Sequence, residues 1–280
     1  MIGQVYKAQT DKFTVKCKDK LIKCYARGNI KKRKEDILVG DFVEFEKDVI
    51  VSVKERKNRF IRPSVSNVDL ILLLISPEPK PDFYLIDKVL VNAIKENAEV
   101  VFVINKTDVD ENLFEQIKDE YKNLNLEFVK ISAKNNQGVE QLKDRLRNKL
   151  SVLVGQSAVG KTTLINSMFN LDMKTGELSS IGRGKHTTTR SEIFEYGDIK
   201  VVDSPGFAVI DANVSAEELP EYYEEYFVQS SKCKFRGCTH TSEPDCQVKK
   251  LVSEGVLSEK RYQRYVEIYN DLLNRRKIYE

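Results

Sequence analysis

The chain has 280 residues, of which 41% are hydrophobic and 32% charged, with a formal net charge of only +3. This composition is typical of a globular protein of two or three compact domains, and its longest apolar run is far shorter than the ~20 residues of a membrane span. The N-terminus lacks the long apolar stretch of a signal peptide, so we expect a cytoplasmic protein without a membrane partner. The five cysteines, an odd number, argue against a disulfide framework.

The charge is unevenly distributed along the chain. Residues 1–66 contain 17 Lys and Arg against 9 Asp and Glu, a net charge of +8, whereas the remaining residues carry 29 against 34, a net charge of −5. A basic module joined to a near-neutral body favours a polyanionic partner for that module. Lysines that merely solvate exposed strands are an alternative of equal weight.

Residues 1–64 predict a small all-β domain. Short segments of alternating apolar and polar residues are separated by turn signals, for example at residues 28–29 and 40–41. About five short strands in about 60 residues indicate an OB-fold barrel, although an SH3-like barrel would give nearly the same pattern. Cys17 and Cys24 lie on these predicted strands, where we expect ordinary core residues.

Residues 65–211 predict an α/β domain. Apolar strands are expected at residues 68–76, 100–104, 126–131, 151–154 and 199–202, and helices at residues 82–97, 111–124, 139–146 and 161–169. Strands that alternate with helices indicate a parallel sheet with helices on both faces. After residue 211 the strand pattern stops, and residues 212–280 predict a small helical module that needs something besides a large core to hold it.

A phosphate-binding loop follows the predicted strand at residues 151–154. Residues 155–162 match G-x-x-x-x-G-K-[ST] and open a helix, which is the context that this motif requires. The glycines let backbone N–H groups surround phosphate, Lys161 would reach the β- and γ-phosphates, and the Thr162 hydroxyl would bind Mg²⁺. The predicted GTP contacts here are Gly155, Gln156, Ser157, Ala158, Val159, Gly160, Lys161, Thr162 and Thr163.

Two further motifs select guanine. Residues 105–108 read Asn-Lys-Thr-Asp, the N-K-x-D signature, at the carboxyl end of a predicted strand. The carboxylate of Asp108 accepts hydrogen bonds from the ring N–H and the exocyclic amine of guanine, which adenine does not offer. By itself this tetrapeptide could be a plain turn, but the S-A-K motif at residues 132–134 also follows a strand. The predicted contacts are Asn105, which ties the loop to the phosphate loop, Lys106, which covers the base, Asp108, Ser132, Ala133 and Lys134.

The switch elements complete the nucleotide site. Residues 203–206 match D-x-P-G, so Asp203 would hold Mg²⁺ through a water and the Gly206 N–H would sense the γ-phosphate. The Gly-rich, basic residues 182–190 form the expected switch loop, in which Thr189, or alternatively Thr188, would complete the Mg²⁺ shell. The guanine motifs precede the phosphate loop, the reverse of the usual order, which indicates a circularly permuted domain.

A metal site is predicted near the C-terminus. The spacing C-x₄-C-x-H-x₅-C places three thiolates and one imidazole together, a donor set that suits one structural, tetrahedral Zn²⁺. Free cysteines beside an unrelated histidine are the alternative. The predicted ligands are Cys233, Cys238, His240 and Cys246.

Taken over its whole length, the chain resembles the RsgA (YjeQ) family of circularly permuted GTPases. The resemblance rests on the basic barrel, the motif order N-K-T-D, S-A-K, G-x-x-x-x-G-K-T, T-T-T, D-S-P-G, and the zinc motif. It implies an OB-fold that contacts ribosomal RNA, and a GTPase that assists late maturation of the small ribosomal subunit and is stimulated by that subunit.

Two residues depart from common GTPase patterns. Phe207 follows Gly206 where many GTPases carry a glutamine that orients the attacking water, so intrinsic hydrolysis should be slow. His186 in the switch loop is the candidate catalytic group, in addition to Lys161 and Thr162, and the bound ribosome would order it. Ala158 stands where the family usually has glycine, and we expect its methyl to be tolerated.

Three classes of function compete. A GTPase for assembly of the small subunit, with GTP, GDP and ribosomal RNA as partners, is favoured over a nucleotide-regulated protein for a different RNA, and both over a signalling GTPase. The basic barrel and the lack of a lipidation motif disfavour the last class. We expect a monomer without a DNA partner, and the run Lys31, Lys32, Arg33 and Lys34 either contacts the RNA backbone or is a solvated loop.

Overall fold

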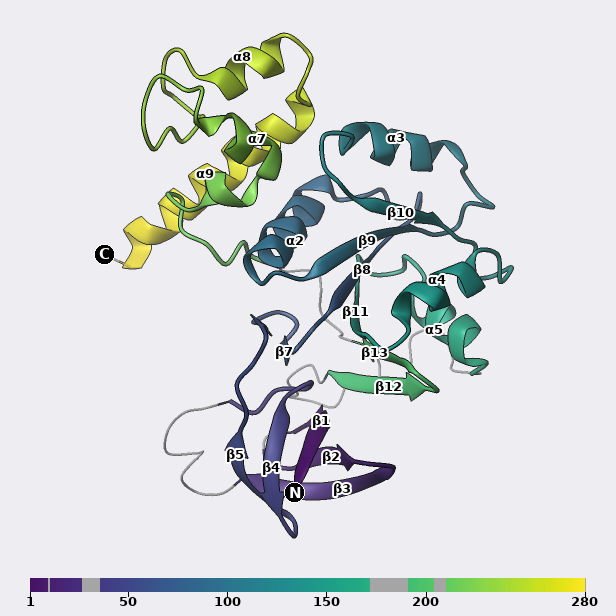
Figure 1. Ribbon diagram of the computed structural model, residues 1–280. Helices are drawn as coiled ribbons and strands as arrows, with labels where there is room; N and C mark the ends of the chain where they lie inside the picture. Colours follow the sequence, from purple (N-terminus) through teal and green to yellow (C-terminus); the bar gives the residue numbers. More distant parts are fainter. Residues whose placement is uncertain (10, 27–35, 172–190, 204–209, 280) are drawn as a thin grey trace.

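A computed structural model describes residues 1–9, 11–26, 36–171, 191–203 and 210–279. The basic run at residues 31–34 and the switch loop at residues 182–190 lie outside these ranges. The barrel, the α/β domain and the C-terminal helices form three neighbouring parts (Figure 1). Within the described part of the chain, every helix is too short or too polar to cross a bilayer.

The N-terminal barrel is closed by five strands. They are β1 (Ile2–Ala8), β2 (Phe13–Cys17), β3 (Lys20–Ala26), β4 (Phe42–Glu46) and β5 (Val49–Val53). The pairing order is β1-β2-β3-β5-β4, and β4 pairs back onto β1. Strands β3 and β5 are parallel, whereas the other barrel pairs are antiparallel. This Greek-key closure is that of an OB-like barrel and decides against an SH3-like one.

The barrel core explains the alternating sequence pattern. Side chains at every second position, among them Val15, Val43 and Phe45, are fully buried inside the barrel. Cys24 belongs to this core as expected, whereas Cys17 is only half-buried at its border.

The α/β domain is built on a mostly parallel sheet in the order β10-β9-β8-β11-β13-β12. Its strands are β8 (Leu70–Ile75), β9 (Glu99–Ile104), β10 (Glu127–Lys130), β11 (Leu150–Val154), β12 (Glu192–Tyr196) and β13 (Ile199–Asp203). The first five in this order are parallel, but β12 is antiparallel to β13. The expectation of a last strand at residues 199–202 therefore missed β12, which pairs with β13 as a hairpin around residues 197–198.

Helices cover both faces of this sheet. They are α2 (Phe83–Lys95), α3 (Asn112–Glu120), α4 (Val139–Leu146) and α5 (Lys161–Phe169). In β8, Ile71 and Leu73 belong to the core beneath α2 and α3, whereas Leu72 and Leu74 belong to the core beneath α4 and α5. Because successive strand residues point to opposite faces, a strand covered on both faces must be apolar throughout.

The barrel is joined to the α/β domain through its first strand. Lys7 of β1 pairs with Glu192 of β12, so the barrel strands and the α/β strands form one sheet of eleven strands. The short hairpin of β6 (Arg59–Phe60) and β7 (Val65–Ser66) connects the two parts along the chain.

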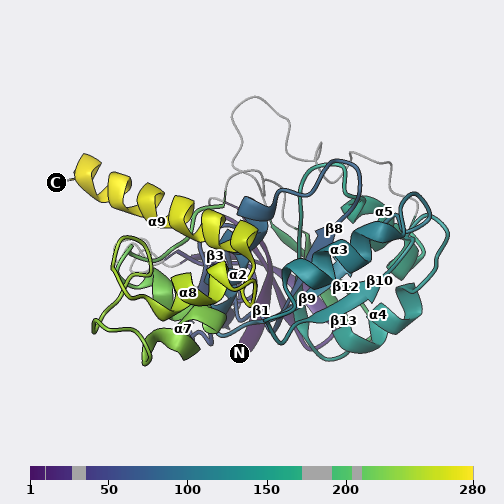
Figure 2. The same cartoon turned by 90° about the horizontal axis from the view of Figure 1, so that it is seen from above.

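The C-terminal part consists of a 3₁₀ helix and three α-helices. They are η1 (Leu219–Tyr222), α7 (Glu224–Ser230), α8 (Gln247–Ser253) and α9 (Glu259–Tyr279). Tyr223, Tyr226 and Tyr265 are buried in its centre with stacked and edge-to-face rings, and Val91 of α2 joins the same cluster. This part therefore has an aromatic core of its own as well as its Cys/His cluster. Figure 2, seen from above, shows α9 running past α2 toward the C-terminus.

Candidate nucleotide and metal sites

The carboxyl ends of three parallel strands carry the nucleotide motifs. The N-K-T-D loop follows β9, the phosphate loop follows β11, and Asp203 is the last residue of β13. Parallel strands end at one edge of the sheet, where open α/β sheets bind their ligands. The topology thus brings together motifs that lie far apart in this permuted sequence.

Close packing requires the two outer glycines of the phosphate loop. A Cβ atom on Gly155 would lie 2.4 Å from the Leu74 carbonyl oxygen, and a Cβ on Gly160 would lie 2.4 Å from Asn105 Nδ2. Gly160 also has φ of +100°, in the region that favours glycine. Ala158 has φ of +66°, so the small methyl at this position occupies a left-handed conformation.

Asn105 connects three loops. Its side chain is 2% exposed, and its Nδ2 donates to the carbonyl of Val159 in the phosphate loop at 2.9 Å. Its Oδ1 accepts from the backbone N–H of Ala133 in the S-A-K loop at 3.0 Å. Since both ends of this buried amide are paired, replacing it would leave unsatisfied groups in two loops.

Lys106 and Asp108 belong to the N-K-T-D loop and contact the two other loops or their neighbours. Asp108 is exposed, and its Oδ1 accepts from the Ser132 hydroxyl at 2.7 Å, which is the main cause that lowers the pKa of its carboxyl. Lys134 and Lys106 lower it further by their charge. Lys106 Nζ donates to the carbonyl of Ala158 at 2.9 Å and to that of Glu78. The carboxylate is thus ionised and held in one orientation.

The phosphate side of the site holds a half-buried amine. Lys161 Nζ donates to the carbonyls of Gly155 and Gln156, at 2.7 Å each. Burial lowers the pKa of Lys161, and the charge of Asp203 opposes that shift. Asp203 is itself 6% exposed, and Thr162 and Thr163 lie half-buried in the first turn of α5.

Part of the predicted site lies outside the described residues. This applies to His186, Thr188 and Thr189 of the switch loop, and to Gly206 and Phe207 after Asp203.

The four predicted metal ligands do converge. The donor atoms of Cys233, Cys238, His240 and Cys246 all lie within 4.8 Å of one another, and three of these residues are buried. Cys233 Sγ lies 3.9 Å from Cys246 Sγ and 3.7 Å from His240 Nδ1. Zinc–sulfur bonds of about 2.3 Å in a tetrahedron separate the sulfurs by about 3.8 Å, so this cluster has the size of a zinc site.

Residues around the cluster orient its ligands. His240 Nε2 lies 3.2 Å from the Ser230 hydroxyl, which leaves Nδ1 facing the cysteines. Burial lowers the pKa of His240, which keeps the imidazole neutral, as a metal ligand must be. Burial also raises the pKa of the Cys238 thiol to about 12, so metal binding would release protons.

A buried charge network, which no sequence motif indicates, joins α2 to the C-terminal part. Asp87 of α2 is 0% exposed and accepts from Arg261, Arg264 and the Tyr121 hydroxyl. Arg261 also donates to the buried Glu225. Burial lowers the pKa of Arg261, but the carboxylates of Asp87 and Glu225 raise it by more. Burial raises the pKa of the Asp87 carboxyl, and the charges of Arg261 and Arg264 oppose that shift. Since all three neighbours donate to Asp87, its oxygens act as acceptors of charge-assisted hydrogen bonds.

The barrel side has a smaller and more exposed polar contact. Glu195 of β12 accepts from the Tyr6 hydroxyl at 2.7 Å and from Lys16, both on barrel strands. Burial raises the pKa of Glu195, but the hydrogen bonds from Lys16 and Tyr6 outweigh it, and the net pKa is lowered. Lys7 and Glu192 form a second ion pair at 2.7 Å, with side chains 32% and 38% exposed.

Comparisons with known proteins agree with this geometry. Residues 53–213 match the model of the RsgA GTPase, and residues 2–50 that of the RsgA N-terminal domain. The small ribosomal subunit biogenesis GTPase RsgA of a Geobacillus species is 36% identical, over 99% of both chains. The crystal structure of YjeQ from Thermotoga maritima superposes with a TM-score of 0.81 at 35% identity, covering 97% of this chain and 98% of that one. The structure of YloQ, a circularly permuted GTPase, gives a TM-score of 0.77 at 30% identity, covering 98% and 95%.

Proposed function

Because the chain belongs to the RsgA family of GTPases, we propose that it hydrolyses GTP while assisting late maturation of the small ribosomal subunit. The observation that carries this proposal is the joining of the N-K-T-D, S-A-K and phosphate loops through Asn105 at one sheet edge. Relatives of nearly full length carry the name of a small ribosomal subunit biogenesis GTPase.

Asp108 would recognise guanine, and the Ser132 hydroxyl, which donates to Asp108 Oδ1, orients its carboxylate. Its carboxylate would accept from the ring N–H and the amine of guanine, while the Lys106 stem covers the base and residues 132–134 face the guanine oxygen. We expect Asp108→Asn to weaken GTP binding at least about 100-fold, because an amide offers one acceptor where guanine presents two donors.

Xanthosine triphosphate provides the matched control for this variant. Xanthine carries a carbonyl in place of the exocyclic amine, so Asp108→Asn should bind the xanthine nucleotide better than the wild type does. Equal GTP affinity of both proteins, measured by equilibrium titration, would contradict this assignment.

Phosphate binding uses the loop at residues 155–160 and the amine of Lys161. The β- and γ-phosphates would replace the two loop carbonyls that Lys161 now contacts, and the N–H groups at the start of α5 would add donors. Thr162, Asp203 and Thr189 are the residues suited to hold Mg²⁺, which supplies charge neutralisation on the phosphates. Gly206 would sense the γ-phosphate.

Hydrolysis needs a group that orients water, which Phe207 cannot do. We assign this role to His186, brought to the γ-phosphate when the subunit is bound. His186→Ala is expected to lower subunit-stimulated turnover by about 100-fold, a typical contribution of a positioned acid–base group, while GTP affinity stays unchanged. Full stimulated turnover of the variant would remove His186 from the mechanism.

The barrel and the C-terminal part would both contact ribosomal RNA. The barrel contributes its excess of positive charge, including the run at residues 31–34. In the C-terminal part, Phe235 is 43% exposed between the exposed Lys234 and Arg236, a pattern that suits stacking on a base beside a phosphate. The protein would act as a monomer in the cytoplasm, on RNA and on neither DNA nor membranes.

The nucleotide cycle follows from these parts. GTP would order both switches and favour the subunit-bound form, and loss of the γ-phosphate contact at Gly206 would favour release. A shift of the C-terminal part alone would have to break the buried contacts of Asp87, at a cost of about 3–5 kcal/mol. We therefore infer that the C-terminal part moves together with α2, and that the change at Gly206 passes first to residues 211–213.

Turnover of GTP by the purified chain, alone and with ribosomal particles, tests the proposal. Strong stimulation by small subunits, but not by large subunits or bulk RNA, is expected. Slow turnover that no ribosomal particle changes would favour a nucleotide-regulated protein for a different RNA.

A further inference from the structure

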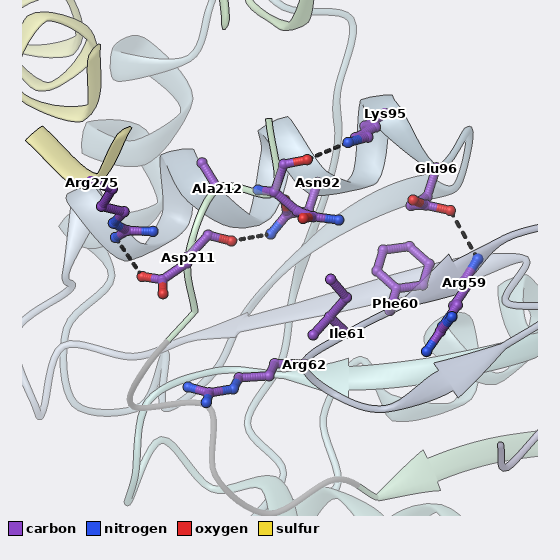
Figure 3. A pocket seen from close by; sticks show the side chains of 11 residues that line it. Arg59, Phe60, Ile61, Arg62, Asn92, Lys95, Glu96, Asp211, Ala212 and Arg275 are labelled. Atoms are coloured by element: carbon purple, nitrogen blue, oxygen red, sulfur yellow. Dashed lines mark hydrogen bonds and ion pairs between the residues drawn. The ribbon is translucent and has the colours of Figure 1, made fainter. Parts of the chain in front are cut away.

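A cavity of about 300 Å³ lies where the three parts of the chain meet (Figure 3). Its walls come from the hairpin that leaves the barrel, the C-terminal half of α2, residues 211–213, and Arg275 of α9. This cavity lies apart from the nucleotide loops and from the Cys/His cluster, and neither site uses its residues.

The cavity has an apolar floor. Phe60 and Ala212 are 6% and 5% exposed, whereas Ile61 is 57% exposed and lies beside Phe60 (Figure 3). A large apolar side chain open to solvent inside a concavity is a common feature of ligand sites.

The rim of the cavity is mainly cationic. The cavity is lined by two carboxylates, those of Glu96 and Asp211, and by four basic side chains, those of Arg59, Arg62, Lys95 and Arg275. The Arg59 side chain is 50% exposed, and its Nη2 lies 3.4 Å from Oδ2 of the exposed Asp36. Arg275 Nη2 lies 2.7 Å from Asp211 Oδ1. Exposed ion pairs of this kind contribute little to stability, so an incoming phosphate could compete for both arginines.

The wall formed by residues 211–213 follows the predicted D-S-P-G switch motif closely in sequence. Asn92 donates to the carbonyl of Asp211 at 2.9 Å and accepts from the N–H of Asn213 at 2.8 Å, and Lys95 donates to the carbonyl of Asn213. These contacts hold the segment that follows the D-S-P-G motif against α2. An occupant of the cavity would touch this segment, so its affinity would depend on the bound nucleotide.

We propose that this cavity binds one unpaired nucleotide of an RNA strand, with the base against Ile61 and the backbone phosphates near Arg59 at one end of the cavity and Arg275 at the other (Figure 3). Proteins recognise unpaired bases by stacking on aromatic side chains and on arginine planes. Here the exposed Ile61 offers an apolar surface for a base, and the guanidinium groups of Arg59 and Arg275 line the same cavity. The source of the strand, the small ribosomal subunit, rests on the proposed function. A free mononucleotide offers the same chemistry, and the experiment separates the two sources.

The test uses the full chain, loaded with GDP or with a non-hydrolysable GTP analogue, and a fluorescent single-stranded hexauridylate. Uridine is chosen because a guanine would enter the N-K-T-D site. Ile61→Asp is expected to weaken hexauridylate binding about tenfold or more, and Arg59→Gln to weaken it less. Val256→Asp, which changes an apolar residue 49% exposed between α8 and α9, is the matched control and should bind as the wild type does.

Two further readouts make the result decisive. A strand carrying 4-thiouridine should photo-crosslink to the peptide at residues 59–62 of the wild-type chain, and its affinity should differ between the two loaded forms. Crosslinks confined to other peptides, or equal binding by wild type and Ile61→Asp, would overturn the inference. Displacement by uridine monophosphate at equal concentration would overturn the RNA strand as the source.

The two proposals fail separately. If small subunits stimulate hydrolysis by the wild type but Ile61→Asp binds hexauridylate as tightly as the wild type, the cavity assignment is wrong and the GTPase function stands. If no ribosomal particle stimulates the wild type, the proposed function is wrong, whatever the hexauridylate result.

Discussion

The α/β domain joins its two neighbours by different means. On the barrel side, strand β12 pairs with β1, and partly exposed ion pairs support a shared sheet. On the C-terminal side no strand pairing is seen among the described residues, and the contact is centred on a network of buried charges around Asp87, beside Val91 in the tyrosine cluster.

The two contacts differ in how they connect a neighbouring part to the nucleotide site, through the backbone on one side and through side chains on the other. Strand β12 follows the segment predicted to be the switch loop, and it pairs with β13, which ends at Asp203, so the barrel is attached by backbone to a strand beside the predicted nucleotide site. The C-terminal part is attached by side chains to α2, which lies before the N-K-T-D motif. We therefore expect the Asp87 contact to dominate stability, whereas a change at the nucleotide site would reach the barrel through β12 and the C-terminal part through residues 211–213.

Loss of a metal ligand should have the largest effect. Cys246→Ser removes one of the four donors, and structural zinc contributes about 10–16 kcal/mol in zinc-finger peptides. If the cluster holds zinc as we propose, Cys246→Ser should bind no zinc and its residues 231–246 should become sensitive to protease, while barrel and α/β domain stay folded. Cys17→Ser, a half-buried barrel cysteine outside the cluster, is the control. Unchanged zinc content of Cys246→Ser would contradict the assignment.

Asp87→Ala should come next. The substitution leaves Arg261 and Arg264 buried without their shared carboxylate, which should lower the free energy of unfolding by about 3–5 kcal/mol. Urea unfolding measures this.

The barrel side supplies the control for Asp87. Glu192→Ala removes a partly exposed pair with Lys7 and should cost less than about 1 kcal/mol. An equal decrease in the free energy of unfolding for the two variants would contradict the proposed difference between the two contacts.

The smallest effect is expected at Glu195, and it should depend on pH. Its folded pKa lies below the ordinary 4.5, so its contribution is present above pH 4.5 and is lost as pH falls through the folded value. Glu195→Gln keeps the hydrogen bonds of Tyr6 and Lys16 but loses the charge. The wild type should therefore be more stable than Glu195→Gln at pH 7, and the difference should shrink below pH 4.5 in urea titrations. A constant difference would contradict the ionised contact.

The nucleotide loops and the Cys/His cluster could be predicted because the residues of each motif lie close together in the sequence. Each loop is a short motif at the end of an apolar strand, and the rule that parallel strands end at one sheet edge brings the motifs together. The ligand spacing of Cys233, Cys238, His240 and Cys246 likewise lies within one short segment.

The contacts between the parts could not be predicted in this way. Asp87 and Arg261 are 174 residues apart and each resembles an ordinary helix charge, so only the packed structure shows that they meet. Strand β12 was missed although its hairpin left a signal, since the turn residues Gly197 and Asp198 follow a segment that contains Ile193, Phe194 and Tyr196. The tyrosine core of the C-terminal part was hidden because Tyr223 and Tyr226 stand in an acidic segment that reads as exposed.

The most direct test of the account is the affinity of the chain for small ribosomal subunits in its two nucleotide states. Binding is measured with the protein loaded with a non-hydrolysable GTP analogue and with GDP, at one fixed salt concentration. The account predicts that the GTP-like form binds tighter by about 5–150-fold, the usual range of coupling between two sites. Equal affinity in both states would contradict a GTPase whose hydrolysis releases it from the subunit.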